Sequence, residues 1–367
     1  MTATDSIAEG SRQDARAFVY ISNAEDGDIG TYRMLPDTGM LQPGPRVPVA
    51  PMVMPMAVSH DRRFLFAAVR SKPFSIVTFA IDGANGALTR VSQSPLPESM
   101  CYLSLDKTGR YLFAACYAGS LVSVQAVDAD GRVADEPLQV VATGRHAHSV
   151  RIDESNRFVF VPTLGSDAVF QFTFDAQSGR LRSNTPSLVL VKPSTGPRHV
   201  ITSADNRFVY VDGEMLGTVM TFALDAATGL LSEVDSASGV PPEANLVPGT
   251  VRGTQPGRDT ERDIWAADIH ATPDGRFLYM SERTTSTLAQ FDVDGTSGRL
   301  AYRRSTPTEK QPRGFAIDGA GKFLVATGEK SETISVHAID AATGALGPPR
   351  KYPAGRGANW VEIVSFD

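Results

Sequence analysis

The sequence from Val150 to Leu181 reads VRIDESNRFVFVPTLGSDAVFQFTFDAQSGRL, and it is one unit of a repeat. The unit begins with a short apolar run, followed by a polar turn with a basic residue before an aromatic one, at residues 156–158. A run of β-branched and aromatic residues, a break of small residues, a second alternating run and a turn at residues 175–179 complete it. Alternation with a period of two, between clusters of Gly, Asn, Asp and Ser, is typical of strands joined by tight turns.

Two markers of this unit recur seven times. The first is the aromatic residue after the first turn, preceded by a basic residue in every copy but one: Phe18, Phe64, Tyr111, Phe158, Phe208, Phe277 and Phe323. The second is a turn from an aspartate to a glycine, at 37–39, 82–86, 130–131, 175–179, 225–229, 294–298 and 340–344. The aromatic markers lie 46 to 50 residues apart, with one interval of 69. Four short strands with their turns fill such a period, so we predict an all-β fold, a seven-bladed β-propeller with four-stranded antiparallel blades.

The two ends of the chain are expected to close the ring. Residues 1–16 are polar, and we predict a flexible tail before a propeller that spans residues 17–367. The first repeat starts late, at Phe18, with what corresponds to the second strand of the other units. The run from Asn359 to Phe366 alternates like a missing first strand. Pairing of this run with the first repeat would remove the exposed sheet edges of an open array.

Composition narrows the class of protein and of partner. The 367 residues are 42% apolar and 21% charged, with 32 glycines, which fits a turn-rich β-protein built as one repeating unit. A net charge of -6 argues against a nucleic-acid partner, although a local pocket can still attract an anion. From the sequence we expect no secretory signal and no stretch long enough to span a membrane. Cys101 and Cys116 lie in apolar runs, which predicts buried free thiols and a cytoplasmic location.

The strand order predicts where a site can lie. Residues before an inner strand and residues after the second strand of a blade should meet on one face, at the mouth of the central channel. Ionisable residues gather in these positions in blades four to seven. The candidates are His146, His148, Arg198, His199, Glu214, Asp268, His270, Glu282, Arg283 and Arg313. Four of the six histidines of the chain are among them.

His146 and His148 lie two residues apart in a segment that we expect to be extended, so both side chains would point to one side. Such a pair is compatible with metal ligation, with a general base, and with hydrogen bonds to a neighbouring blade. A zinc site usually takes three firm protein ligands, and the sequence has no histidine pair with zincin spacing. We therefore predict neither a metal nor another cofactor.

Arg198, Arg283 and Arg313 belong to three consecutive predicted blades. Guanidinium groups suit bidentate binding of carboxylate or phosphate, so their convergence favours an anionic ligand. Salt bridges between blades are the alternative, and both can hold at once. Glu214 follows a second strand, where a carboxylate beside arginines stays ionised and can position or deprotonate water. Residues 239–263 form the long interval before an inner strand, and we predict that they are a partial lid over the mouth.

These motifs together resemble the propeller lactonase family, which contains bacterial propeller-type 6-phosphogluconolactonases and fungal carboxymuconate lactonising enzymes. The motifs are the His-x-His of 146–148, Gly-Pro-Arg-His at 196–199, Asp-Ile-His at 268–270, Ser-Glu-Arg at 281–283 and Pro-Arg-Gly-Phe-Ala-Ile-Asp at 312–318. The resemblance covers residues 17–366 and implies chemistry on a lactone or its ring-opened acid without a required metal. It implies an active site at the positions of His148, Arg198, Glu214 and Arg283. Relatives more often have Ser-Asn-Arg where this chain has Glu282.

Lactone hydrolysis needs an activated water, donors for the developing oxyanion, and groups that recognise the rest of the substrate. We assign Glu214 or His148 as the base or water positioner, and Arg198 and Arg283 to the oxyanion and to anionic substituents. The remaining candidates bind substrate: His146, His199, His270, Asp268, Glu282 and Arg313.

The expected partner is a small anionic lactone, and the sequence indicates no membrane partner and no particular oligomeric state. The resemblance favours a 6-phosphogluconolactone-like substrate. However, the sequence has no Gly-rich phosphate loop, and Glu282 would repel a phosphate beside Arg283. Uronate or aldarate lactones and a carboxymuconate-type cycloisomerisation therefore stay open. A non-catalytic interaction platform is the other alternative, but it would expose apolar residues at the mouth, and WD signatures are absent.

Overall fold

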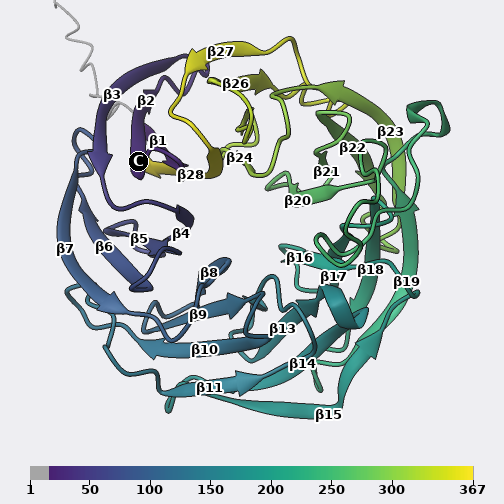
Figure 1. The fold of residues 1–367 in the computed structure, drawn as a ribbon, viewed down its shortest axis with the longest axis horizontal. Helices are drawn as coiled ribbons and strands as arrows, with labels where there is room; N and C mark the ends of the chain where they lie inside the picture. The colour runs from purple at the N-terminus through teal and green to yellow at the C-terminus, as the bar shows by residue number, and fades with distance from the viewer. Residues whose placement is uncertain (1–15, 367) are drawn as a thin grey trace, which may run out of the picture.

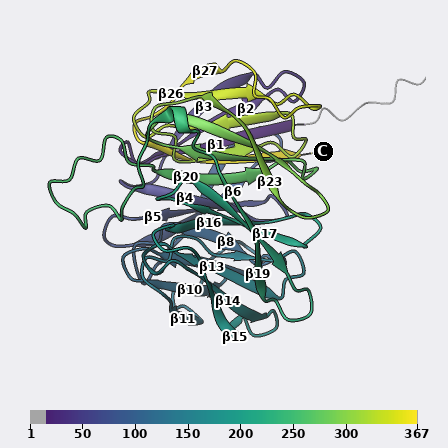
Figure 2. The same ribbon diagram turned by 90° about the vertical axis from the view of Figure 1, so that its right-hand side faces the viewer.

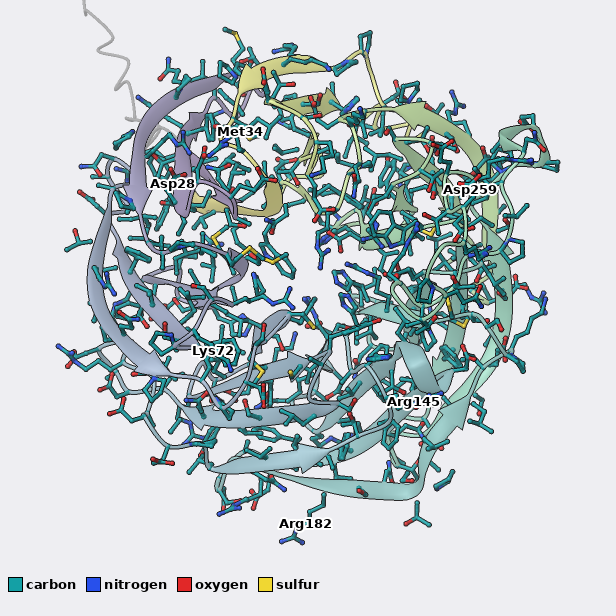
Figure 3. The ribbon with its side chains drawn as sticks, viewed as in Figure 1. Asp28, Met34, Lys72, Arg145, Arg182 and Asp259 are labelled. Atoms are coloured by element: carbon teal, nitrogen blue, oxygen red, sulfur yellow. The ribbon has the colours of Figure 1, made fainter. Side chains whose placement is uncertain are left out.

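Seven four-stranded antiparallel sheets surround a central channel (Figure 1). The computed structural model describes residues 16–366, and it confirms the predicted seven-bladed β-propeller. The second strand of each blade is buried on both faces because neighbouring sheets pack against it, as in Phe64–Val69, where every residue is buried. Outer strands carry exposed charges, such as Arg182, which points away from the ring (Figure 3).

The first four blades each have their innermost strand at the channel and their outermost strand at the rim. Blade one contains β28 (Ala358–Phe366), β1 (Arg16–Asn23), β2 (Asp28–Met34) and β3 (Leu41–Pro48). Blade two contains β4 (Val53–Val58), β5 (Phe64–Val69), β6 (Ser75–Ile81) and β7 (Leu88–Pro95). Blade three contains β8 (Tyr102–Leu105), β9 (Tyr111–Cys116), β10 (Leu121–Ala126) and β11 (Gln139–Ala142). Blade four contains β12 (Arg151–Ile152), β13 (Phe158–Thr163), β14 (Ala168–Asp175) and β15 (Arg180–Leu190).

The last three blades follow the same plan. Blade five contains β16 (Pro197–Thr202), β17 (Phe208–Gly213), β18 (Thr218–Leu224) and β19 (Leu231–Ser238). Blade six contains β20 (Ala266–Ala271), β21 (Phe277–Glu282), β22 (Thr287–Val293) and β23 (Leu300–Pro307). Blade seven contains β24 (Phe315–Ile317), β25 (Phe323–Ala326), β26 (Thr333–Ala338) and β27 (Arg350–Pro353). Two short 3-10 helices lie in loops, η1 (Leu164–Ser166) and η2 (Pro242–Ala244). No helix within residues 16–366 is long and apolar enough to cross a membrane.

The ring closes through both ends of the chain, as predicted. The last strand, β28, pairs antiparallel with β1, from Arg16 opposite Phe366 to Asn23 opposite Ala358. Arg16, which the sequence pattern assigns to the tail, is instead the first residue of β1. The rest of the predicted tail lies outside the described residues. Cys101 and Cys116 are free and buried, in agreement with the sequence.

The two sequence markers form one contact between neighbouring blades. The Phe158 ring packs on the turn of the next blade, where a Cβ at Gly229 would lie 2.0 Å from the ring. The guanidinium of Arg157 lies 4.9 Å from the Phe158 ring centroid and donates a hydrogen bond to the carbonyl of Ala226 in that turn. The same pairs recur around the ring: Phe18–Gly86, Phe64–Gly131, Tyr111–Gly179, Phe208–Gly298, Phe277–Gly344 and Phe323–Gly39. The last pair joins blade seven to blade one.

The insertion at residues 239–263 connects β19 to β20 and protrudes from one face of the ring (Figure 2). Gly249 N donates to the carbonyl oxygen of Met215 at 2.8 Å, and Val247 forms a parallel bridge with Asp263. Asp263 is buried and pairs with Arg258 at 2.6 Å. The insertion thus packs against the loop that follows β17, on the face where the channel mouth is expected.

Candidate active site

Glu214 is the centre of a buried ion-pair network at the channel mouth. It directly follows β17, where the chain leaves the second strand of blade five. Its Oε2 accepts hydrogen bonds from Arg198 Nε and Arg283 Nη2, both at 2.8 Å, and its Oε1 accepts one from Trp265 Nε1 at 3.2 Å. One carboxylate is therefore shared by two guanidinium groups from adjacent blades.

Both arginines are also held by the backbone at the start of β20. Arg283 donates from Nε to Trp265 O at 3.1 Å and from Nη2 to Ala266 O at 2.8 Å. Its guanidinium also lies 3.8 Å from the Trp265 ring centroid. Arg198 Nη1 donates to Ala267 O. Since Arg198 and Arg283 are only 1% and 3% exposed, their positions are set by the protein before any ligand arrives.

His199 connects Arg198 to Asp268. Its Nε2 lies 2.9 Å from Arg198 Nη1, and its Nδ1 lies 2.7 Å from Asp268 Oδ1. A guanidinium can only donate, so Nε2 of His199 accepts and the Nδ1 proton is donated to Asp268. Burial, reinforced by the charge of Arg198, lowers the pKa of His199 to about 4. The ring is therefore neutral, and both of its nitrogens are engaged within the protein.

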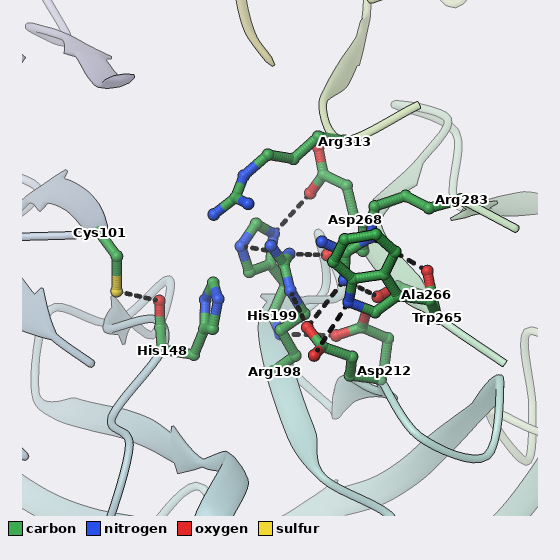
Figure 4. A network of polar contacts seen from close by, with 12 residues as sticks. Cys101, His148, Arg198, His199, Asp212, Trp265, Ala266, Asp268, Arg283 and Arg313 are labelled. Carbon is green, nitrogen blue, oxygen red and sulfur yellow. Dashed lines mark hydrogen bonds and ion pairs between the residues drawn. The ribbon is translucent and has the colours of Figure 1, made fainter. Parts of the chain in front are cut away.

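His148 supplies a second neutral imidazole. Its ring centroid lies 5.3 Å from that of His199, and its Nδ1 is buried without a hydrogen-bond partner among the described residues. Burial, followed by the charge of Arg198, holds the pKa of His148 well below its usual range. The His148 ring and the Arg313 guanidinium point into the same space beside His199 (Figure 4). Cys101 donates its thiol proton to His148 O at 3.4 Å.

Glu214 and Arg283 keep their charges although both are buried at the mouth. Burial raises the pKa of Glu214, but the charges of Arg283 and Arg198 outweigh burial and lower it overall. Burial lowers the pKa of Arg283 to about 9, so this guanidinium stays protonated at neutral pH. Arg313, with an 18% exposed side chain, is only loosely held by Glu329 at 3.4 Å. Three guanidinium groups, those of Arg198, Arg283 and Arg313, thus converge at the mouth, which favours an anionic ligand.

The structure adds residues that sequence reasoning missed. Trp265 immediately precedes β20, a position where the strand order predicts mouth residues, but an indole is not an ionisable group and gave no signal. Asp212, two residues before Glu214, is buried, and its Oδ1 accepts from His199 N at 2.5 Å. Burial raises the pKa of Asp212 to about 8. Arg70, just after β5, was not missed, since it follows a second strand and the strand order predicts it at the mouth. It donates to Ser99 Oγ at 3.0 Å, and its guanidinium lies near enough to Arg313 for the two charges to interact.

The structure corrects several predicted positions. Arg198 and His199 lie within β16, and Asp268 lies within β20, instead of before these inner strands. The segment at His146 is not extended, because its φ of 62° lies in the left-handed region. Its ring stacks on Tyr117 at 4.1 Å, with Nδ1 3.2 Å from Tyr117 O. His270 lies within β20 instead of before it, because this strand already begins at Ala266. Its Nε2 lies 3.3 Å from Asp268 Oδ2, and it lines a different part of the channel from the arginines.

Glu282 is also kept apart from the arginine cluster. Its Oε1 accepts from Trp265 N at 2.8 Å, and its Oε2 accepts from Thr285 N at 2.6 Å and Thr285 Oγ1 at 2.7 Å. The side chain lines a separate cavity together with Tyr302 and residues of the insertion. β21 ends at Glu282, and Arg283, the next residue, donates to Glu214, so the two neighbouring side chains have different partners. We therefore no longer expect Glu282 to repel a phosphate that binds beside Arg283. Within residues 16–366, no group of three or more His, Cys, Asp and Glu side chains is placed to hold a metal ion.

Comparison with known proteins agrees with this architecture. A family model described as lactonase, 7-bladed beta-propeller, matches residues 17–363. A 6-phosphogluconolactonase of Serratia proteamaculans is 37% identical over 350 residues, 95% of this chain and 99% of the relative. Another from Pectobacterium carotovorum is 37% identical over 349 residues, with the same coverage of both chains. The solved periplasmic gluconolactonase PpgL of Pseudomonas aeruginosa is 28% identical, with a TM-score of 0.82 over 95% of this chain and 99% of that chain. The chain therefore belongs to the lactonase family of seven-bladed β-propellers.

Proposed function

We propose that this lactonase hydrolyses a negatively charged sugar lactone at the channel mouth, with His148, Arg198, Glu214 and Arg283 as its active site. The observation that carries the proposal is the neutral His148 ring beside a cluster of fixed arginines. Relatives named 6-phosphogluconolactonase and gluconolactonase support a sugar lactone as substrate. Ionisable side chains line the mouth, which argues against the alternative of a non-catalytic platform that binds other proteins through apolar residues.

In the proposed reaction, water attacks the lactone carbonyl carbon and gives its proton to His148. The carbonyl oxygen becomes an oxyanion, which the Arg198 and Arg283 guanidinium groups stabilise. The ring C–O bond then breaks, and the alkoxide takes the proton back from His148, which leaves a hydroxy acid. The arginine charges that keep His148 neutral also stabilise the attacking hydroxide, so the low basicity of the ring is partly offset.

Glu214 has a different role in this proposal. Its oxygens already accept three hydrogen bonds and its pKa is lowered, so it is a poor proton acceptor. Of the two candidate bases, His148 is therefore favoured, and Glu214 orients the two guanidinium groups. Asp268 acts on Arg198 through His199.

A phosphorylated substrate is the first choice, because Arg313 and Arg70 add positive charge around the mouth and Glu282 faces elsewhere. The similarity to a gluconolactonase keeps an unphosphorylated gluconolactone as the second choice. The carboxymuconate-type reaction remains an alternative. We propose a small-molecule substrate without a nucleic-acid or membrane partner, and a cytoplasmic location, which the two free cysteines suit.

Acid release from 6-phosphogluconolactone and glucono-δ-lactone, followed in a pH-stat, tests the assignment. Glu214→Gln and Arg198→Ala should each lower kcat about 100-fold, the size of a lost oxyanion contact. Glu233→Gln, on the exposed part of β19, is the matched control and should keep full turnover. Arg313→Gln should raise KM for the phosphorylated lactone more than for the unphosphorylated one. Full turnover by the Glu214 and Arg198 variants would show that the mouth cluster is not the active site.

A further inference from the structure

The central channel contains a second compartment on the other side of Asp268 from the arginine cluster. This compartment, which we call the lower cavity, has a volume of about 320 Å³ and is lined by the inner strands of six blades. Its polar lining includes Tyr102, Arg151, His270 and Glu362. His60 and Lys107, just after β4 and β8, place it toward the face opposite the insertion.

Aromatic rings separate the lower cavity from the mouth. The Tyr102 ring lies edge-on to His199 at 5.1 Å and to Trp360 at 5.4 Å, and the His199 and Trp360 rings are 6.1 Å apart. Asp268 continues this layer, with Oδ1 toward His199 on the mouth side and Oδ2 toward His270 on the cavity side. The cavity lining includes none of the four residues that we propose as the active site.

The lining combines one guanidinium with several hydrogen-bonding groups and aromatic walls. Arg151, Tyr102 and Glu362 line this one cavity, where the Arg151 charge opposes the rise in pKa that burial causes at the Tyr102 hydroxyl and the Glu362 carboxyl. Trp360 Nε1 donates to Glu362 Oε1 at 2.9 Å. The His270 side chain is 37% exposed and packs edge-on against the Phe315 ring.

These groups match one ligand chemistry. A guanidinium pairs with a carboxylate, while carboxyl and imidazole groups exchange hydrogen bonds with hydroxyls. Indole and phenyl rings cover the C–H faces of a polyol. The volume lies at the lower end of the range for small-molecule pockets. We propose that the lower cavity is a second binding site, for a small polyhydroxylated carboxylate. The proposal does not depend on the proposed function, although the product of that reaction belongs to the same ligand class.

The chain carries a natural reporter for each compartment, because its two tryptophans are Trp265 at the mouth and Trp360 in the lower cavity. In Trp265→Phe, the remaining fluorescence comes from Trp360, which lines the lower cavity and also lies 6.1 Å from the His199 ring, so the effect of Arg151→Gln assigns a response to the cavity. In Trp360→Phe, the remaining fluorescence reports the mouth. D-gluconate is the probe, and sorbitol, which lacks the carboxylate, is the ligand control.

We expect D-gluconate to change the fluorescence of Trp265→Phe saturably, and sorbitol to bind at least about tenfold more weakly. In the Trp265→Phe background, Arg151→Gln should weaken gluconate binding about tenfold or more. Glu362→Gln in the same background is a second, nearly isosteric variant, which should also weaken binding and serves if the first does not fold. Arg182→Gln should have no effect. A response in Trp360→Phe alone, or no response in Trp265→Phe at saturating gluconate, would overturn the proposal. Lactone turnover by Arg151→Gln, measured separately with little product present, should be unchanged, which keeps this test distinct from that of the proposed function.

Discussion

Arg157 and Phe158 show, at the residue scale, why the sequence repeat is so regular. The arginine covers its neighbouring ring and binds a carbonyl of the next blade, while the ring fills the space above Gly229. A glycine is required there for two reasons, because its φ is +73° and because the aromatic ring leaves no room for a Cβ. Each marker is therefore one half of the contact that joins two blades.

We expect Gly229→Ala to lower the free energy of unfolding by about 2–4 kcal/mol, because it combines left-handed strain with overpacking. The midpoint of urea denaturation, with its slope, measures this loss. Gly109 has nearly the same φ, +72°, but nothing lies within 4 Å of its missing Cβ, so Gly109→Ala carries only the cost of the left-handed backbone, about 1–2 kcal/mol. Equal losses for the two variants would mean that the ring contact does not restrict this position.

Asp212 makes stability depend on pH. Burial raises its pKa to about 8 in the folded protein, whereas the unfolded chain loses this proton near 3.8. The folded state holds this proton more tightly than the unfolded chain does. The stabilisation that protonated Asp212 contributes is therefore fully present below about pH 4 and is lost as pH rises toward 8. Asp212→Asn should remove this loss and gain stability relative to the wild type between about pH 5 and pH 8. Denaturation midpoints across this window test the slope, with the exposed Asp135→Asn as control; identical slopes in all three proteins would exclude Asp212 as the cause.

At the scale of the elements, strand alternation and strand ends sort neighbouring residues into different environments. Glu282, the last residue of β21, lines the cavity beside the insertion, whereas Arg283, which follows it, donates to Glu214. Asp268 lies between the mouth and the lower cavity because β20 begins two residues before it. The insertion acts on the same elements, since the guanidinium of Arg252 lies 4.1 Å from the Trp265 ring centroid.

We propose that the insertion acts as a partial lid that steadies Trp265. Arg252→Ala should loosen the indole that donates to Glu214, and should lower kcat/KM about tenfold, the effect of losing about 1–2 kcal/mol of positioning. The melting temperature should hardly change, because Arg252 lies outside the blades. Steady-state kinetics with a thermal melt measures both effects, and Arg182→Ala, on the outside of the ring, is the control. Unchanged kinetics would contradict a role for the insertion in the site.

At the scale of the whole molecule, closure of the ring depends on one strand that is remote in sequence from its neighbour. The pairing of β28 with β1 gives blade one its inner strand and protects the edge of β1. The mouth network also depends on closure, because its residues come from different blades around one axis.

Removal of residues 358–367 should expose the β1 edge and abolish a single cooperative melt, which near-ultraviolet circular dichroism and gel filtration would detect. In contrast, a circular permutant can link Phe366 to Arg16 by a short turn and open between Asp135 and Glu136. It should melt within a few degrees of the wild type, because Arg16 already lies opposite Phe366. A truncated chain that melts like the wild type would show that β28 is dispensable.

The sequence by itself determined the seven blades, the closure of the ring by both ends and the face that carries the candidate site, because these follow from local periodicity and from the spacing of turn residues. It also pointed to Arg198, Glu214 and Arg283, which the structure brings into one network. Only the tertiary structure decided which charges share a cavity. The pairing of Glu214 with two arginines, the separation of Glu282 and the position of His270 beyond Asp268 depend on strand starts and on packing between blades, and neither is encoded in the local pattern.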